Sequence, residues 1–396
     1  MRTVKAIRKA IRELPAGLDE TYEKILLGVP IQDQEILQKI LLWLAFAVVP
    51  LTLEELHEAI AIEPRQDDLD GESRLSSPQD ILGLGGSLVN VSEQGHVRLA
   101  HLSVKDYLLS SKMHAYGRLA MFALHSDKAN YCLATSCLTY FSFKDLDAGP
   151  RDVLDEYLER LEKRPLLKYA ATAWAYHVRK TKRDEELEAL VMRFFSVHSR
   201  RKFMSWVQVL NADYNFKWDL YPRHATSLYY AASFGLHKTV SALIQEGAVL
   251  DAPGSRFGGT ALHAAVLRQH VPAMHSLLEA GASPSKADFN RVTPLHTAAS
   301  HGNMDVICTL LKYGAHKEAV DGMGETPYDW AERAEQVETL NILQGLDAST
   351  TEEGPNIPEM VVWKRQVPYF PDFYGRRSGL DSSIVISVEI VKSTNA

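Results

Sequence analysis

The sequence predicts a mainly α-helical protein that carries one small β-hairpin near its N-terminus and a helical solenoid in its last third. Across most of residues 15–345, apolar side chains recur at the three- and four-residue spacing of amphipathic helices. Two short segments, 88–91 and 96–99, flank a turn-forming stretch and predict the hairpin. Beyond residue 220 a pattern returns every 33 or 34 residues, which is typical of stacked helical repeats.

Length and composition indicate two or three folded domains. The chain has 396 residues, 46% of them hydrophobic and 23% charged, which supports buried cores and excludes wholesale disorder. The formal net charge is -7, so we expect no nucleic-acid partner, because phosphate binding needs a cationic surface. The longest apolar run covers residues 40–49, far fewer than the about 20 that cross a bilayer.

The number of cysteines indicates the cellular compartment in which the protein works. Three cysteines are too few for a four-thiolate zinc site, and this usage is typical of a reducing environment. We expect a cytoplasmic protein, with the nucleus as the alternative, and no membrane partner. Residues 1–14 form a basic amphipathic pattern that a mitochondrial presequence shares, but they lack its serine-rich character and continue into more structured sequence.

We expect residues 1–112 to form a winged-helix-like region. Helical patterns cover residues 15–27 and 32–49, and a third helix begins after Pro50. A short helix over residues 78–88 precedes the hairpin. Helices followed by a hairpin are the element order of a winged helix.

Two capping boxes are predicted in this region, because the first amides of a helix need side-chain acceptors. Thr52 and Glu55 have the required spacing at the start of the third helix. Ser103 and Asp106 have it after the hairpin, in a helix whose apolar stripe comprises Val104, Tyr107 and Leu108.

Residues 113–221 predict an α-helical connector with breaks near Gly149-Pro150 and Pro165. Its aromatic side chains recur at helical spacing, so we expect them to fill a core rather than to hold a cofactor. They include Tyr140, Phe141, Tyr169, Trp174, Tyr176, Phe194, Phe195 and Trp206.

The repeat after residue 220 is the most specific signal in the sequence. Its first marker starts at intervals of 34, 33 and 33 residues, at Thr226-Ser227-Leu228-Tyr229, Thr260-Ala261-Leu262-His263, Thr293-Pro294-Leu295-His296 and Thr326-Pro327-Tyr328-Asp329. A second marker follows the first three starts by 21 residues, at Gly247-Ala248, Gly281-Ala282 and Gly314-Ala315. We therefore expect four repeats over residues 222–345 and a C-terminal extension over 346–396, with a strand-like segment at 383–391.

These markers resemble the ankyrin repeat, a hairpin loop followed by two antiparallel helices. Thr caps the first helix, Pro in its first turn gives up no bonded amide, and Gly ends the second helix in a left-handed conformation. The resemblance implies that His263 and His296 bond the Thr of their own repeat and adjoining backbone rather than a metal. Repeat two departs from the pattern, since Gln269 stands where Gly235 and Gly302 stand in repeats one and three.

The first half resembles the region that follows the NTPase core of fungal NACHT-type signal-transduction ATPases, through the strings LPAGLDETYEKIL, LLWLAFAVVPLTLEELHEAIAI, VRLAHLSVKDYLL and PLLKYAATAWAYHV. In that family the ATPase is followed by a winged-helix element, a helical segment and often ankyrin repeats. The sequence contains no Gly-x-x-x-x-Gly-Lys-Ser/Thr string, so the loop that holds ATP phosphates is missing. The resemblance implies the sensing half of such a protein.

Some near-motifs could suggest chemistry. His57 and Glu58 match the start of a zinc-protease helix, but Ala61 replaces the second histidine, so we interpret them as a solvated helix surface. Residues 83–86 are glycine-rich, but no strand precedes them, which indicates a turn rather than a dinucleotide site.

Two other groups of residues could suggest a catalytic triad or a thiol site. Among His101, Ser103 and Asp106, the aspartate is better placed to cap a helix than to orient an imidazole. Cys132 and Cys137 have no second ligand pair and are expected to be buried. We expect no metal, no cofactor and no catalytic residue, and therefore no enzyme.

A docking surface is expected on the repeats, because ankyrin stacks present their hairpin tips and the exposed positions of their first helices as one concave face. Phe and Arg dominate interface hot spots, although a tip phenylalanine can also pack on its own hairpin. Mapping the exposed positions predicts partner contacts at Arg256, Phe257, Leu267, Arg268, Phe289, Asn290, Ser300, His301, Met323 and Arg333.

We therefore expect non-catalytic protein recognition by the sensor or adaptor half of a NACHT-ankyrin signalling protein. One alternative is an accessory or scaffold protein, or even an enzyme, of a fungal metabolic pathway. Another is a DNA-binding regulator that uses the winged helix. The second alternative is disfavoured because residues 51–100 contain ten acids and three bases, a net charge of 3 - 10 = -7, which repels phosphate.

Overall fold

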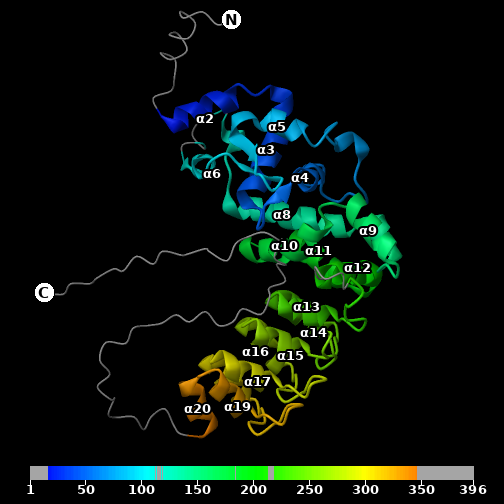
Figure 1. Ribbon diagram of the computed structural model, residues 1–396, viewed down its shortest axis with the longest axis vertical. Coiled ribbons are helices and arrows are strands. Elements are labelled where there is room, and N and C mark those ends of the chain that lie inside the picture. The colour runs from blue at the N-terminus through cyan, green and yellow to red at the C-terminus, as the bar shows by residue number, and fades with distance from the viewer. Residues whose placement is uncertain are drawn as a thin grey trace, which may run out of the picture.

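The protein is described by a computed structural model that covers residues 17–345 except residues 112, 114–116, 118, 183 and 213–217. Its helices follow one another in a curved row (Figure 1). Residues 18–109 lie at one end, residues 126–211 in the middle and residues 227–343 at the other end. The basic pattern at residues 1–14 and the strand-like segment at 383–391 lie outside the described residues.

The N-terminal domain has the expected order of helices followed by a hairpin, with one strand added. Its helices are α2 (Leu18–Leu27), α3 (Ile31–Phe46), α4 (Leu53–Ile60), α5 (Asp80–Gly85) and α6 (Leu102–Leu109), with 3-10 turns η1 (Gly71–Ser73) and η2 (Gly86–Leu88). Strands β1 (Leu51–Thr52), β2 (Val89–Val91) and β3 (His96–Leu99) form an antiparallel sheet in the order β1-β3-β2.

Strand β1 is the element that the sequence did not predict. The helix expected to reach Val49 ends at Phe46, since the chain must become extended before Pro50 to enter the sheet. Leu51 then lies opposite Val97, and both side chains are buried.

The capping box at the start of α4 is confirmed. The Thr52 N–H donates to Glu55 Oε2 over 2.8 Å, and the Glu55 N–H donates to Thr52 Oγ1 over 3.2 Å.

The capping box predicted after the hairpin is wrong, whereas its apolar stripe is confirmed. His101 caps α6, because its Nδ1 accepts from the Ser103 N–H over 3.1 Å. The Ser103 hydroxyl instead contacts His101 Nδ1 and the Tyr22 hydroxyl, each over 2.7 Å, so Asp106 does not cap the helix. The three stripe residues are buried: Val104, Tyr107 and Leu108.

Two further interpretations of this region need correction. Residues 83–85 belong to α5 rather than to a turn. A glycine is required at Gly85, because a Cβ atom there would lie 2.5 Å from Cγ2 of Val89. The surface assigned to His57 and Glu58 is not solvated, since Glu58 is 2% exposed and His57 Nε2 contacts the Leu75 carbonyl oxygen over 2.9 Å.

The middle of the chain is helical, with more interruptions than predicted. Its elements are η3 (Ala120–Phe122), α8 (Ser126–Phe141), η4 (Lys144–Ala148), α9 (Leu154–Lys163), α10 (Leu167–Lys180), α11 (Glu185–Phe195), η5 (Val197–Ser199) and α12 (Arg200–Asn211). Asp184 begins α11 by accepting from the Leu187 N–H over 2.9 Å. Cys137 is buried as expected, but Cys132 is exposed.

Aromatic side chains join this middle segment to the repeats. Trp174 packs against Phe194 and Trp206, with ring centroids 5.5 and 6.2 Å apart. Trp206 in turn lies 5.0 Å from Tyr230, the first-repeat residue that it contacts edge-on. The core interpretation of these aromatics is therefore confirmed, with Tyr176 only half-buried among them.

A buried carboxylate joins the N-terminal domain to the middle segment. Glu58 Oε2 accepts from the Tyr140 hydroxyl over 2.6 Å and from the Leu166 N–H over 3.0 Å. Its other oxygen faces Arg74 at 3.3 Å and Arg164 at 3.8 Å. Burial raises the pKa of Glu58, although these donors and cations oppose the effect.

The C-terminal part contains four pairs of antiparallel helices, as the ankyrin resemblance implies. They are α13 (Ser227–Ser233) with α14 (His237–Gln245), α15 (Ala261–Leu267) with α16 (Val271–Glu279), α17 (Pro294–His301) with α18 (Met304–Lys312), and α19 (Pro327–Arg333) with α20 (Val337–Leu343). Each first helix is capped by the expected threonine: Thr226, Thr260, Thr293 or Thr326.

The repeat histidines hold their loops. His263 Nδ1 contacts Thr260 Oγ1 over 2.9 Å, and its Nε2 contacts the Val292 carbonyl oxygen over 3.0 Å. His296 makes the same pair of contacts one repeat later, to Thr293 and to the Glu325 backbone. Both imidazoles therefore have the structural role that the resemblance implies.

Left-handed residues link the two helices of each repeat. Gly235 and Gly302 have φ angles of 68° and 67°. Gln269 has a φ angle of 55° at the equivalent place, so repeat two keeps the conformation without the glycine.

Replacing Glu58 should strongly destabilise the protein. We expect Glu58→Ala to lower the free energy of unfolding by about 3–5 kcal/mol, because it strands the buried donors and cations around the carboxylate. Tyr140→Phe should lower it by about 1–3 kcal/mol. Urea unfolding followed by circular dichroism measures both, and Glu159→Ala at an exposed ion pair with Lys163 is the matched control. A Glu58→Ala midpoint equal to that of the control would contradict this prediction.

The Glu58 site should also make stability depend on pH. Its folded-state pKa lies above the ordinary value of 4.5, so its contribution is fully present below pH 4.5 and is lost as pH rises through the folded pKa. We therefore expect the free energy of unfolding of the wild type, minus that of Glu58→Gln, to decline from pH 4 toward pH 7. Parallel urea titrations measure this difference, and a rising difference would show that the cations dominate.

Two glycines of repeat one provide a matched pair for the left-handed positions. A Cβ atom on Gly235 would lie 2.7 Å from the His270 ring, whereas one on Gly247 would meet nothing within 4 Å. Both have positive φ angles, so we expect Gly247→Ala to cost about 1 kcal/mol and Gly235→Ala about 2–3 kcal/mol. Equal losses in urea unfolding would exclude a packing role for Gly235.

Candidate functional site

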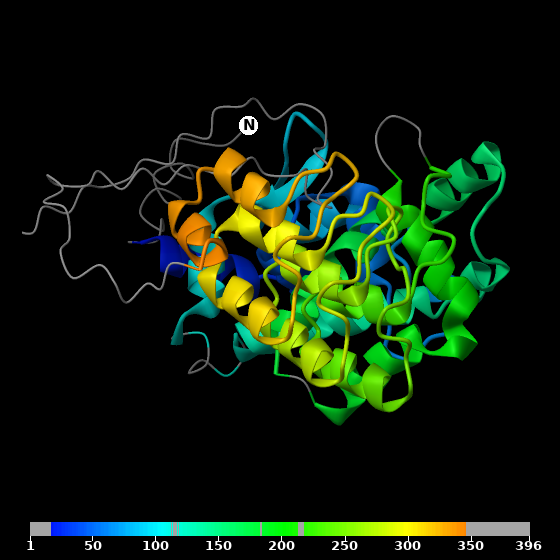
Figure 2. The same cartoon turned by 90° about the horizontal axis from the view of Figure 1, so that it is seen from below.

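The hairpin loops of the repeats form one edge of the molecule. They lie between α14 and α15, between α16 and α17, and between α18 and α19. Figure 2 shows these loops side by side, extending beyond the ends of the helices. We refer to residues 253–259, 286–292 and 319–325 as the hairpin edge.

Backbone hydrogen bonds connect each tip of the hairpin edge to the next. The Phe289 N–H donates to the Phe257 carbonyl oxygen over 2.8 Å, and the Gly322 N–H donates to the Asn290 carbonyl oxygen over 2.7 Å. The spacing between tips is therefore fixed by the backbone rather than by side chains.

Aspartates hold the second and third tips from within. Asp288 Oδ1 accepts from the Asn290 and Val292 N–H groups over 2.8 and 2.9 Å. Asp321 Oδ1 does the same for the second and fourth residues that follow it, again over 2.8 and 2.9 Å. Although burial opposes it, these N–H donors lower the pKa of Asp321, so the carboxylate remains charged.

Large apolar side chains project from the hairpin edge into solvent. Phe257 is 55% exposed, Phe289 is 67% exposed and Met323 is 82% exposed. Phe289 packs partly against neighbouring residues and partly faces solvent. Its ring covers Gly258, where a Cβ atom would lie 2.5 Å from it, and its centroid lies 5.9 Å from that of His224, yet most of the side chain stays accessible.

The ten residues mapped from the sequence fall into two rows. Five lie on the hairpin edge: Arg256, Phe257, Phe289, Asn290 and Met323. The other five lie near the ends of the first helices: Leu267, Arg268, Ser300, His301 and Arg333. A helix of seven or eight residues separates the rows by about 10–12 Å.

The helix-end row is less available for contact than the hairpin edge. Ser300 donates to the Thr297 carbonyl oxygen over 2.9 Å, and His301 Nδ1 contacts the same oxygen over 2.7 Å. Arg333 reaches back to both carboxylate oxygens of Glu325, over 3.2 and 2.6 Å. Leu267 remains 43% exposed.

The sequence mapping missed two exposed cations of the hairpin edge, Lys286 and Arg291. Arg291 is exposed and has a φ angle of 62°, at the place where the neighbouring hairpins have Gly258 and Gly324. The signal available in the sequence was a non-glycine residue at a position that favours glycine.

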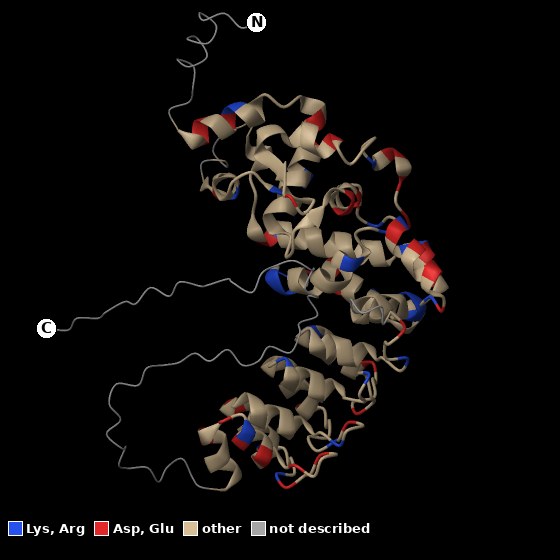
Figure 3. Ribbon diagram, in the orientation of Figure 1, with Lys and Arg blue, Asp and Glu red and all other residues tan. Residues whose placement is uncertain are grey.

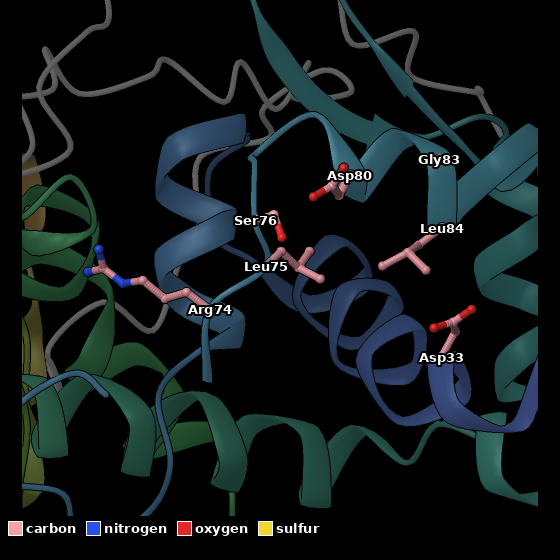
Figure 4. A pocket seen from close by; sticks show the side chains of 7 residues that line it. All are labelled: Asp33, Arg74, Leu75, Ser76, Asp80, Gly83 and Leu84. Carbon is pink, nitrogen blue, oxygen red and sulfur yellow. The ribbon is translucent and has the colours of Figure 1, made fainter. Parts of the chain in front are cut away.

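Two hollows of similar size lie outside the repeats. One, of about 430 Å³, is lined by Asp33, Arg74, Leu75, Ser76, Asp80, Gly83 and Leu84, and Figure 4 shows the Arg74 guanidinium extending away from the others. It contains no histidine or cysteine, and its two carboxylates are those of Asp33 and Asp80. Asp80 Oδ2 accepts from the Ser77 N–H over 2.9 Å, so it holds the turn before α5.

The second hollow, of about 420 Å³, contains a phenol and a thiol. Burial, together with the neighbouring Asp184 carboxylate, raises the pKa of Tyr131 to about 12. Although Cys132 lies at the surface, partial burial of its thiol raises the pKa of that group. Both groups are therefore protonated at neutral pH, which is the opposite of nucleophile activation.

Within the part of the chain that the structure describes, no three His, Cys, Asp or Glu side chains gather as metal ligands. The helices in the same part are too short or too polar to span a bilayer.

Comparisons with protein families agree with this architecture. Residues 23–125 match the family described as "GPI inositol-deacylase, winged helix domain". Residues 199–288 match "Ankyrin repeats (3 copies)", and residues 277–331 match "Ankyrin repeats (many copies)". The ankyrin match thus begins at α12, before the first predicted repeat.

Among individual relatives, the chain is 29% identical over 297 residues to the azaphilone pigments biosynthesis cluster protein L of Monascus ruber, covering 69% of this chain and 61% of that protein. It is 40% identical over 119 residues to the mouse ankyrin repeat and SOCS box protein 16, covering 28% of this chain and 26% of that protein. The chain thus spans 61% and 26% of the lengths of these two relatives. It combines a winged-helix domain of the GPI inositol-deacylase type with ankyrin repeats.

Proposed function

We propose that this chain is a non-catalytic recognition module that binds a protein partner through the hairpin edge. The observation that carries the proposal is the row formed by Phe257, Phe289 and Met323, which are more than half exposed on tips joined by backbone hydrogen bonds. An ordered row of exposed apolar side chains is typical of an interface rather than of a free surface.

The absence of catalysis is part of the proposal. In the described residues, the pKa values of the phenol and the thiol in one hollow are raised, and the other hollow has no histidine or cysteine. The histidines with the most buried rings in the repeats, His263 and His296, are engaged with threonine and backbone. Binding is therefore the activity that the geometry supports best.

A signalling role as the sensor half of a NACHT-ankyrin protein extends this proposal. It is supported by the four strings shared with that family and by the order of winged helix, helical segment and repeats. In this context the N-terminal domain would contact protein rather than DNA, because residues 51–100 carry a net charge of 3 - 10 = -7. We propose the cytoplasm as its compartment.

A second candidate is an accessory or scaffold role in a fungal metabolic pathway. The observation that favours it is the similarity to the Monascus ruber protein, whose name assigns it to a pigment biosynthesis cluster. The two candidates share the same binding surface and differ in the identity of the partner, which is a signalling protein in one case and a pathway enzyme in the other.

Removing the tip aromatics should weaken partner binding. We expect the double variant Phe257→Ala, Phe289→Ala to lose at least about tenfold in affinity for the native partner, because each exposed ring contributes contact area that alanine lacks. The partner is the polypeptide that co-purifies with the tagged full chain from its native cells. Affinity is then measured by biolayer interferometry with the purified pair.

The matched control is Val249→Ala, Val337→Ala, which removes side chains that are 72% and 67% exposed in the repeats but lie outside the hairpin edge. It should leave the affinity unchanged. If both double variants bind alike, the hairpin edge is not the docking surface and the proposal fails.

A further inference from the structure

We infer that the segment recognised by the hairpin edge is acidic and carries apolar side chains, in the manner of an extended Glu/Asp-rich peptide interrupted by leucines. This inference rests on the proposed function and adds the chemistry of the partner to it. It depends on which charges of the hairpin edge remain available for a partner.

The available charges at the edge are cationic. Arg256, Lys286 and Arg291 are exposed there. The Arg256 guanidinium lies 5.3 Å from the centre of the Phe257 ring and uses one N–H on the Leu220 carbonyl oxygen, 3.3 Å away. Its remaining donors stay beside an exposed aromatic face.

The acids of the edge are engaged with the protein itself. Asp288 accepts from two N–H groups of its own loop. Asp321 is 4% exposed and also accepts from the Trp330 indole over 3.1 Å. Glu325 is paired with Arg333 over 2.6 Å. Figure 3 shows both charge colours on this side of the repeats, but these contacts leave mainly the cations for a partner.

The backbone at Arg291 supports the same interpretation. A non-glycine residue with a φ angle of 62° costs about 1–2 kcal/mol, and its two neighbouring hairpins avoid this cost with Gly258 and Gly324. Among the described residues, none holds the Arg291 guanidinium, so no contact within that part of the chain compensates the backbone strain. Arg291 instead adds an exposed cation to the tip, two residues after the exposed Phe289.

Charge complementarity selects the occupant. Arginine forms bidentate hydrogen bonds with carboxylates. The rings of Phe257 and Phe289 can pack against aliphatic side chains that lie between the carboxylates of the bound peptide. Single-stranded nucleic acid would also satisfy cations beside aromatic rings. A net charge of -7 for the whole chain disfavours a polyanion as long as nucleic acid, whereas a short acidic segment needs only the local patch.

The test is a titration of the full chain with fluorescent twelve-residue peptides. The probe alternates pairs of glutamates with leucines, and two comparison peptides replace either all glutamates with glutamine or all leucines with serine. We expect the probe to bind, both replacements to weaken binding at least about fivefold, and added salt to weaken it further. A single-stranded oligonucleotide that binds more tightly than the probe would overturn the inference.

Arg291→Gly is an informative variant, because we expect it to weaken binding without lowering stability. It should lower affinity for the probe about tenfold while leaving the melting temperature unchanged or higher, since glycine relieves the left-handed strain. Arg291→Lys should retain part of the affinity, and Lys312→Ser, which removes an exposed cation from α18, should retain all of it. Equal probe affinity for the wild type and Arg291→Gly would overturn the inference.

The failure of this inference differs from the failure of the proposed function. If Phe257→Ala, Phe289→Ala loses the native partner while the acidic probe does not bind, protein recognition stands and the acidic chemistry is wrong. If the native partner is also unaffected by that double variant, the docking surface itself is wrong.

Discussion

The structure depends on one constraint, which is that a single ankyrin repeat cannot bury its apolar face alone. At the N-terminal side of the stack the covering surface is the helical middle segment. Trp206 contacts Tyr230 edge-on and also lies against Phe234, with centroids 5.0 and 5.8 Å apart. The core of the middle segment thus continues into the first repeat. At the other end, the described part of the stack finishes with α20, which buries Thr339 and Leu343.

The Glu58 cluster has a comparable role between the first domain and the middle segment. It combines side chains from α4 and α8 with the backbone at Leu166, so the two parts cannot separate without breaking both hydrogen bonds to Glu58. Together with the aromatic core, it connects the three parts of the described chain through buried contacts.

Much of the fold could be predicted because its signals are local or periodic. The repeat markers placed each threonine cap, and the spacing of Thr52 and Glu55 identified a capping box. The errors share a different cause, since they depend on contacts distant in sequence. Strand β1 exists because Leu51 pairs with Val97, and Glu58 is buried because it packs against Tyr140 and Leu166. A pattern read from a short stretch of sequence does not reveal partners that are so distant along the chain.

The candidate surface was predictable to a similar degree. Tip position alone identified Phe257, Phe289 and Met323, but it did not reveal that Ser300 and His301 bond back to their own helix. Arg291 was missed, because its significance comes from a backbone conformation that only the neighbouring glycines make visible.

The backbone hydrogen bonds from Phe289 to Phe257 and from Gly322 to Asn290 set a fixed spacing between the tips of the hairpin edge. Since adjacent tips share a hydrogen bond, the distance between them cannot change to fit a bound peptide. A polypeptide whose anchoring side chains are spaced differently would engage one tip and miss the next. Selectivity in such a molecule would then arise from distance along the bound strand, and a change in the number of stacked units would alter which strands fit.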